Sequence, residues 1–239
     1  MKYIARFSLK DPLLPSDYRP IFVSFFKKAL SDHMEGYFYE DFYGEGAKKK
    51  DLCWSLRLGQ PKFEGRQIRL GQKDMDMTLK FQGPKAASLY FTALLKMKGK
   101  DFPIGLGNTM VLKSLRLVPE KDILGDVALF KILSPLCLRK HDRTTNKDRY
   151  LTVEEEDFEV VFKEKLREER PDLDQEIQDL VLDFSKLKKI VVPAYKIPID
   201  CSLGTFLAQG DKALLNHIQH GGLGSRRASG FGLVENIYI

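Results

Sequence analysis

The chain has 239 residues, 43% of them hydrophobic and 30% charged, with 18 glycines and 11 prolines. This composition is typical of a globular protein that buries its own core, and it excludes intrinsic disorder and collagen-like repeats. The 39 basic and 33 acidic side chains give a formal charge of +6. The length is compatible with one large domain or with two domains of about 120 residues each.

The charge is unevenly distributed along the chain. Residues 1–120 carry 21 basic and 13 acidic side chains, whereas residues 154–183 carry 4 basic and 13 acidic ones. Both halves are basic once this acidic segment is set aside, which favours a polyanionic partner such as RNA, DNA or anionic lipid. The alternative is that a total of +6 is ordinary solubility charge.

The three cysteines, Cys53, Cys137 and Cys201, are far apart and form no C-x-x-C pair. This pattern predicts neither a disulfide framework nor a zinc site, so we expect buried thiols in a reducing compartment. We find no signal peptide and no apolar run of the roughly 18 residues that a membrane span needs. We therefore expect a cytoplasmic protein with no membrane partner, no metal and no cofactor.

Residues 1–120 predict an alternation of strands and helices from their hydrophobic periodicity. Ser16 or Asp17 is expected to cap the first helix, and Pro84 to open the second. The expected strands are 2–9, 52–58, 67–71, 75–81 and 109–118. The expected helices are one whose apolar residues run from Ile21 to Leu30 and one at 84–96. Strand, helix, strand, strand, helix, strand is the order of ferredoxin-like and RNA-recognition domains.

The second half of the chain repeats this order. The expected strands are 127–133, 190–195, 197–205 and 231–239, and the expected helices are 154–169, a continuation after Pro171, and 211–217. We therefore predict an α+β protein with tandem ferredoxin-like, RNA-recognition-like domains at 1–120 and 126–239, joined near residues 119–126.

The most specific motif is a glycine-rich segment at residues 222–232, with the sequence GLGSRRASGFG. It follows an expected helix and precedes the last strand, whereas a dinucleotide-binding loop follows a strand and opens a helix. No G-K-S/T phosphate loop occurs in the chain, so an NTPase is not expected. Glycine amides with Arg226 and Arg227 at their centre could bind phosphates, although a long turn before an edge strand is the alternative.

The spacing glycine, apolar residue, glycine, five residues, glycine, apolar residue, glycine resembles the signature of the CRISPR-associated endoribonucleases of the RAMP superfamily. These enzymes cut precursor CRISPR RNA within its repeats. Further likeness lies in segments 133–139 (LSPLCLR), 147–150 (KDRY) and 204–206 (GTF). The resemblance implies metal-independent cleavage of CRISPR repeat RNA in antiviral defence, and we expect the cut to leave a 2′,3′-cyclic phosphate and a 5′-hydroxyl. The sequence leaves open whether the protein is a monomer or homodimer.

Metal-independent RNA cleavage uses the 2′-hydroxyl as nucleophile and needs a base, an acid and cations around the phosphorane. Histidine suits both proton transfers because it titrates near neutrality. In most members of the resembled family a histidine lies shortly after the first helix, ahead of a glycine, an aromatic residue and a basic stretch. The corresponding segment here, 37–44 (YFYEDFYG), contains no histidine.

Three residues are candidates for catalysis. His141 ranks first, because the loop after the first strand of a ferredoxin-like sheet lies beside the loop before the last, next to Arg226 and Arg227. His33 ranks second, and the alternative is a histidine that merely favours the end of a helix. Tyr39 could position a phosphate, although the aromatic stretch around it could equally form core.

The candidate RNA-binding residues are cations, hydroxyls and glycines. They are Gly222, Gly224, Ser225, Arg226, Arg227, Ser229, Gly230 and Gly232 in the glycine-rich segment, Arg139, Lys140 and Arg143 around His141, and Lys48, Lys49 and Lys50. His217 and His220 could form half of a metal site, but capping or packing fits better because no further ligands are evident. The acidic run 154–157 is expected to form a solvated helix face turned away from RNA.

Two other functions stay open at this point. The chain could be a non-catalytic RNA-binding subunit of the same superfamily that holds guide RNA in a CRISPR effector complex, with the other complex subunits as partners. The missing histidine in segment 37–44 favours this alternative. The third hypothesis is a basic ferredoxin-like module with no role in RNA binding.

Overall fold

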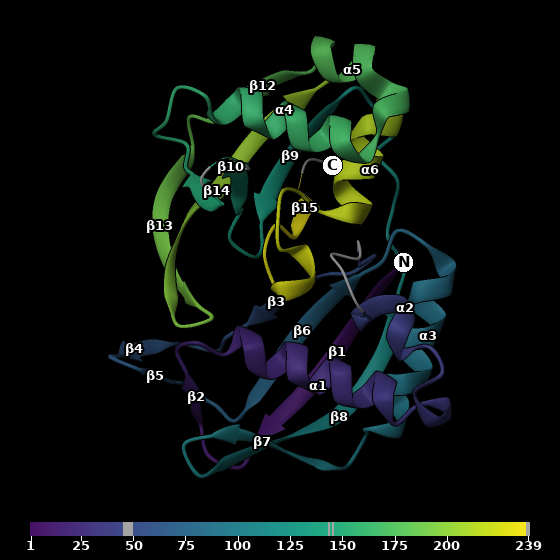
Figure 1. The fold of residues 1–239 in the computed structure, drawn as a ribbon, viewed down its shortest axis with the longest axis vertical. Coiled ribbons are helices and arrows are strands. Elements are labelled where there is room, and N and C mark those ends of the chain that lie inside the picture. The colour runs from purple at the N-terminus through teal and green to yellow at the C-terminus, as the bar shows by residue number, and fades with distance from the viewer. Residues whose placement is uncertain (45–49, 143, 145, 238–239) are drawn as a thin grey trace. The chain divides into compact units, whose positions relative to one another are not determined.

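A computed structural model describes residues 1–44, 50–142, 144 and 146–237 (Figure 1). The chain forms two compact units, Met1–Glu120 with Pro193–Ile197, and Lys121–Val192 with Pro198–Ile239. We refer to them as unit 1 and unit 2, and each is a mixed α+β structure. In the described ranges, the helices are too short or too polar to cross a membrane.

Unit 1 contains a five-stranded antiparallel sheet in the order β3-β6-β1-β8-β7. Its strands are β1 (Lys2–Leu9), β3 (Cys53–Arg57), β6 (Asp74–Lys80), β7 (Asp101–Gly105) and β8 (Asn108–Val118). Burial alternates along β1, with Phe7 buried and Arg6 exposed. The central strand therefore presents one face to the core and a polar face on the other side.

The helices of unit 1 are α1 (Arg19–Ser31), η1 (Met34–Gly36), α2 (Tyr39–Tyr43) and α3 (Pro84–Lys96). Figure 1 shows α1 lying across strands of the sheet. The rings of Phe22 and Phe25, from α1, each lie 5.4 Å from the ring of Phe7 in edge-on contact. The helical spacing of aromatic residues on α1 thus packs against the alternating apolar residues of β1.

A second, small sheet in unit 1 has the order β2-β5-β4, with β2 (Leu13–Pro15), β4 (Lys62–Glu64) and β5 (Gln67–Arg69). In it, Ile68 of β5 pairs with Leu14 of β2 on one side and with Phe63 of β4 on the other. The strand expected at 67–71 therefore exists, but it belongs to this small sheet and not to the central one.

Unit 2 contains a sheet in the order β12-β14-β9-β15, with β13 also paired to β14. Its strands are β9 (Val127–Ile132), β12 (Val181–Asp183), β13 (Leu187–Ala194), β14 (Ile197–Gln209) and β15 (Val234–Asn236). A separate antiparallel hairpin consists of β10 (Leu138–Asp142) and β11 (Lys147–Leu151). The last strand lies antiparallel beside the first, with Val234 opposite Ile132, as the sequence predicted.

The helices of unit 2 are α4 (Phe158–Glu169), η2 (Pro171–Leu173), α5 (Asp174–Asp179), α6 (Lys212–Gly221) and η3 (Arg227–Ser229). The core joins the sheet to α4 through aromatic rings. Phe130 and Phe206 of the sheet stack at 5.3 Å, and Phe162 of α4 lies 5.9 Å from Phe206. This packing fixes α4 on the sheet and with it the residues at the end of that helix.

Most elements expected from hydrophobic periodicity are confirmed, including the strand at 2–9 and the helix at 84–96. The predicted cap of the first helix is wrong, because α1 begins after Tyr18, which makes no side-chain capping bond. The helix expected from residue 154 begins only at Phe158. The carboxylate of Glu155 accepts a hydrogen bond from the Thr152 amide and pairs with Arg149, which holds the acidic run in a turn.

The hairpin of β10 and β11 was not predicted, and β7, β2 and β4 were also missed. His141 therefore lies on a strand, β10, and not in the loop that the sequence indicated. The terminal strand is shorter than expected, and residues 238 and 239 of the predicted range lie outside the described residues.

We expect the Asp211→Ala variant to lose about 1 kcal/mol of stability, the usual contribution of a helix cap. The Asp211 carboxylate accepts hydrogen bonds from the Ala213 and Leu214 amides at 2.7 and 3.2 Å. Urea unfolding of the wild type, Asp211→Ala and Asp211→Asn measures the effect, and Asp211→Asn should stay close to the wild type. An equal loss in both variants would contradict the capping role.

Candidate functional site

The glycine-rich segment 222–232 is a compact loop that folds back on itself. The Leu223 amide donates to the Gly232 carbonyl at 2.7 Å, and the Gly232 amide donates to the Pro135 carbonyl at 2.9 Å. Gly232 has a φ of +71°, and a Cβ there would lie 1.8 Å from the Leu223 carbonyl oxygen. At Gly224, with a φ of +72°, a Cβ would lie 2.6 Å from the Cys137 carbonyl oxygen. Only glycine fits these two close approaches.

The amides of this loop mostly bind protein carbonyls, which corrects the expectation that they approach phosphates. Donors to protein carbonyls are the amides of Gly222, Leu223, Ser225, Ser229, Gly230 and Gly232. Gly222, Gly230 and Gly232 are also buried, whereas Gly224, Ser225 and Ser229 are half-buried. The buried glycines therefore shape the loop, and the half-buried residues of the loop are the ones with surface exposed to solvent.

Four side chains share one face of the β10–β11 hairpin. The strand register places Arg139 opposite Tyr150 and His141 opposite Asp148, and residues two apart on a strand point to the same side. His141 Nδ1 lies 2.8 Å from Asp148 Oδ1, and Arg139 Nη1 lies 3.2 Å from Asp148 Oδ2. These contacts bring the predicted His141 and Arg139 together around a carboxylate that the sequence analysis did not single out.

The Asp148 carboxyl is held ionised by its neighbours. The hydrogen bond from His141 and the charge of Arg139 lower its pKa below the usual value. Because Asp148 engages Nδ1 of His141, the other ring nitrogen, Nε2, is left to exchange a proton with a ligand. The His141 side chain is 41% exposed, so a ligand can reach it.

Arg226 of the glycine-rich loop joins this group. Its Nη2 donates to the Tyr150 hydroxyl at 2.5 Å and lies 3.8 Å from Asp148 Oδ2, and its guanidinium lies 5.5 Å from the centre of the Tyr150 ring. The loop is fixed here because Ser225 donates its amide to the Cys137 carbonyl at 2.7 Å. We call Arg139, His141, Asp148, Tyr150 and Arg226 the hairpin cluster. The strand order had predicted that His141 and Arg226 of this cluster lie close to each other.

Arg227 lies in the interior of unit 2, which corrects the prediction that both arginines of the loop bind a ligand. Its guanidinium donates to the Gly221 carbonyl at 2.9 Å and lies 2.8 Å from Glu169 Oε1. His217 Nε2 lies 3.1 Å from the other oxygen of Glu169. Arg227 and His217 therefore connect α4, α6 and the loop. His220 pairs instead with Asp122, at 2.9 Å.

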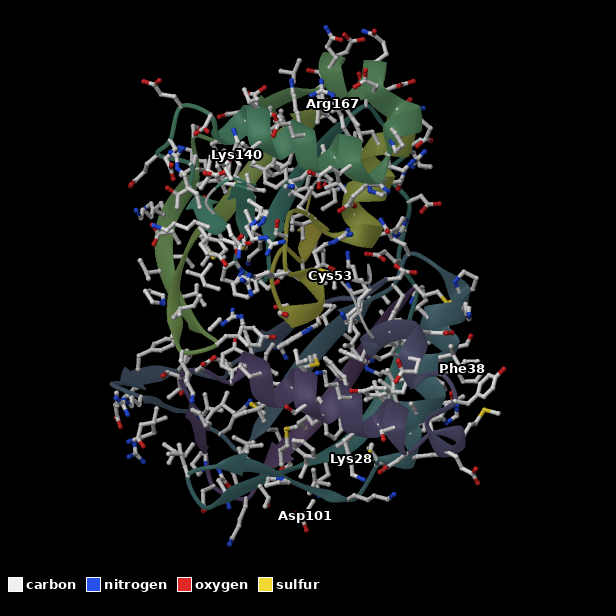
Figure 2. All side chains as sticks on the ribbon, in the orientation of Figure 1. Lys28, Phe38, Cys53, Asp101, Lys140 and Arg167 are labelled. Atoms are coloured by element: carbon white, nitrogen blue, oxygen red, sulfur yellow. The ribbon has the colours of Figure 1, made fainter. Side chains whose placement is uncertain are left out.

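The other cations of the predicted site are distributed differently. Lys140 is exposed on β10 (Figure 2), and its strand position places it on the opposite face of the hairpin from His141. Arg143, Lys48 and Lys49 lie outside the described residues. Lys50 belongs to unit 1, where its Nζ lies 4.9 Å from the centre of the Tyr43 ring.

His33 of unit 1 directly follows the C-cap of α1, as predicted, but it is buried, with 7% of its surface exposed. Its Nε2 lies 3.4 Å from the Thr92 hydroxyl, and its Nδ1 has no hydrogen-bond partner within the described part of the chain. Burial, and secondarily the charge of Lys96, lowers the pKa of His33. The imidazole is therefore neutral at neutral pH and can accept a proton.

In unit 1, two lysines lie beside the aromatic stretch that follows His33. The Tyr39 and Tyr43 rings lie 5.7 Å apart, and burial raises the pKa of Tyr43 to about 12. Lys27 Nζ lies 5.2 Å from the centre of the Tyr43 ring, and burial followed by the charge of Lys27 lowers the pKa of Lys50. Lys27 was missed because nothing in the sequence connects it to this stretch.

Asp148 and Tyr150 were missed as site residues, although segment 147–150 was noted as a likeness. A predicted hairpin that paired segment 138–142 with segment 147–151 would have placed Asp148 and Tyr150 beside His141 and Arg139. The available signal was the motif itself, because the hairpin has no alternating apolar pattern.

Comparisons with known proteins agree with this architecture. The family model described as "CRISPR associated protein Cas6, C-terminal" matches residues 118–236. No curated protein matches the chain significantly in sequence.

Several solved structures are similar over the whole chain. A structure described as "An RAMP protein binding different RNA substrates" has a TM-score of 0.83 at 19% identity and covers 100% of both chains. The product of a Cas6-related gene from Pyrococcus furiosus has a TM-score of 0.83 at 17% identity, over 99% of this chain and 98% of its own. A Thermus thermophilus Cas6 product complex has a TM-score of 0.72 at 13% identity, over 99% of each chain. At these identities, the likeness shows the fold.

Burial of His33 makes the stability of the fold depend on pH. Because the pKa of His33 is lower in the folded chain than its ordinary value near 6.5, the unfolded chain takes up the proton first. This contribution to stability is therefore fully present above about pH 6.5 and is lost as the pH falls through the folded pKa. Urea midpoints at about pH 7.5 and pH 5 should differ more for the wild type than for His33→Gln. Equal differences would contradict this prediction.

Proposed function

Because the chain belongs to the Cas6 family of CRISPR-associated RAMP endoribonucleases, which process precursor CRISPR RNA, we propose that it cuts repeat RNA by 2′-hydroxyl attack on the adjacent phosphate. The reaction forms a bond from the 2′-oxygen to phosphorus as a base takes the 2′-hydroxyl proton. It breaks the bond to the 5′-oxygen, which takes up a proton from a general acid or from water. It leaves a 2′,3′-cyclic phosphate and a 5′-hydroxyl, and it needs no metal. The product is mature guide RNA.

The strand order supports tandem ferredoxin-like domains. In unit 1 the central strand β1 lies between β6 and β8, with α1 and α3 connecting the strands. In unit 2 the first strand β9 lies between β14 and the last strand β15. Both orders are those of a split βαβ plan, in which the first strand lies between the third and the fourth.

The hairpin cluster is the observation that carries the proposed chemistry. His141 Nε2 would take the proton of the 2′-hydroxyl, while Asp148 orients the ring through Nδ1 and stabilises the charge that forms on it. Arg139 and Arg226 supply guanidinium groups that can bind the phosphate and stabilise the negative charge of the phosphorane. His33 is the second candidate for proton transfer, and Lys50 and Tyr39 are candidates for contacts with phosphate or base.

A non-catalytic RNA-binding subunit of a CRISPR effector complex is the alternative. The burial of His33 and the absence of a histidine from segment 37–44 favour it. One similar structure is described as a RAMP protein that binds different RNA substrates, a description that requires no cleavage. Under this alternative the protein would bind repeat RNA without cutting it, together with other subunits of the complex.

The first test is cleavage of labelled repeat RNA in EDTA, beside the same RNA with a single 2′-deoxy substitution upstream of the cut. We expect only the unmodified RNA to be cut. His141→Ala should slow cleavage by roughly 10² to 10⁴, the usual share of one acid–base group, with RNA binding nearly unchanged. His220→Ala is the matched control, since His220 pairs with Asp122 and should be dispensable.

Two outcomes of this test would contradict the proposal. Binding of the repeat RNA without any cleavage would favour the non-catalytic subunit. If His141→Ala cut at the wild-type rate while His33→Ala did not, the order of the two histidines would be wrong.

The two neighbouring arginines of the loop should have separable roles. Arg226→Ala should weaken RNA binding and reduce the slope of log affinity against log salt by about 0.7 to 0.9, one phosphate contact, with little change in stability. Arg227→Ala should instead destabilise the fold by about 1 to 3 kcal/mol, because it removes the arginine partner of Glu169 while His217 still contacts the other carboxylate oxygen. Anisotropy titrations at several salt concentrations and urea unfolding measure the two effects. A salt slope unchanged in Arg226→Ala would refute its contact with phosphate.

A further inference from the structure

A concentrated positive charge lies on the β4–β5 hairpin of unit 1 and at its base, far along the sequence from the hairpin cluster. Residues 57–73 contain five basic side chains and one acidic side chain, Glu64. These 17 residues therefore carry a net charge of +4, half of the +8 of residues 1–120. A local excess of positive charge of this kind favours a polyanionic partner.

The hairpin is an extension of unit 1 with an exposed edge. The strand order β2-β5-β4 makes β4 the edge, and the hairpin turns at Gly65, which has a φ of +59° (Figure 1). Ile68 of β5 is fully buried, but its partner on β4, Phe63, is 71% exposed. An aromatic ring therefore stands in solvent on the outermost strand.

Phe63 is unexpected at this position. Charged residues on an edge strand commonly protect it from pairing with other chains, and Lys62 and Glu64 do so here. An exposed phenylalanine between them works against that protection. The ring also leaves unused the stabilisation that its burial would provide. Aromatic rings flanked by cations are the usual means by which proteins bind unpaired nucleotides, since every base can stack on them.

Three cations of the hairpin and its base are not neutralised by carboxylates. Arg57 lies 2.7 Å from Asp76, and Arg69 lies 3.4 Å from Glu64. In contrast, the side chains of Lys62, Arg66 and Lys73 form no ion pair with any described residue, and all three are exposed. Their charges are therefore available to phosphates.

We propose that the β4–β5 hairpin binds single-stranded RNA, with Phe63 stacking on an unpaired base and Lys62, Arg66 and Lys73 neutralising neighbouring phosphates. A duplex is not the ligand, because its bases are stacked on each other and cannot reach an exposed ring. The contact tolerates any base sequence, since it reads a base face and the backbone charge. The proposal rests on the proposed function only in taking RNA as the ligand.

Anisotropy titrations with a labelled single-stranded RNA of about 12 nucleotides test the stacking contact. The RNA carries 2′-O-methyl riboses so that the 2′-oxygen cannot attack the phosphate and cleavage cannot occur. Phe63→Ala should raise Kd about 10-fold, and Phe63→Tyr should restore binding because its ring also stacks. Leu106→Ala, at another exposed apolar side chain of unit 1, is the matched control and should bind as the wild type does.

The salt dependence of the same titration tests the cations. The variant Lys62→Gln, Arg66→Gln, Lys73→Gln should reduce the slope of log affinity against log salt by about 2, three contacts on a single strand. The control Lys98→Gln, Lys100→Gln, Lys113→Gln removes the same charge from exposed residues elsewhere in unit 1 and should change the slope less. Equal changes in both variants would show that only total charge matters and would overturn the proposal.

Two further measurements complete the test. A blunt RNA duplex should bind wild type and Phe63→Ala equally, and thermal unfolding should show that all variants are folded. If folded Phe63→Ala binds single-stranded RNA as tightly as the wild type does, the hairpin proposal is wrong. If the wild type binds RNA but leaves unmodified repeat RNA uncut, the proposed cleavage fails while the hairpin proposal is still decided by these titrations.

Discussion

The arrangement of the candidate site depends on a close approach between the glycine-rich loop and residues 135–137. Gly224 and Gly232 have positive φ angles and leave no room for a Cβ against the carbonyls of Cys137 and Leu223. Because glycine at these two positions lets the backbone segments come this close, the loop closes on itself and places Arg226 beside Asp148. A glycine-rich motif of this kind therefore acts through its shape, and under the proposed function the side chains that it positions would contact the RNA.

Asp148 organises the charges that the loop brings together. One carboxylate contacts His141, Arg139 and, at a longer distance, Arg226. Three cationic or proton-transferring groups so close together would repel one another without an anion between them. Under the proposed function, the carboxylate lets them gather before RNA arrives, and a phosphate would then bind the outer sides of the two guanidinium groups. Preorganisation of this kind is the main way in which a protein stabilises a phosphorane without a metal.

The sequence predicted what hydrophobic periodicity and strand order control. The alternation in β1, the helical spacing in α1 and the adjacency of β9 and β15 were all correct, and the last of these placed His141 near Arg226. The β10–β11 hairpin was missed because its apolar residues, Leu138 and Leu151, stand only at its open end, with charged residues between them. A hairpin of this composition has no periodic apolar signal, so its site residues Asp148 and Tyr150 were missed with it.

Arg226 and Arg227 show why residue type alone does not determine function. The two are adjacent and chemically identical, yet Arg226 adopts a left-handed backbone conformation with a φ of +59° and Arg227 begins the short helix η3. This change of backbone direction sends one guanidinium to the hairpin cluster and the other to the half-buried Glu169. The buried arginine holds the loop on α4 and α6, and the half-buried one faces the candidate site. A phosphate-binding role for one arginine therefore depends on a structural role for its neighbour.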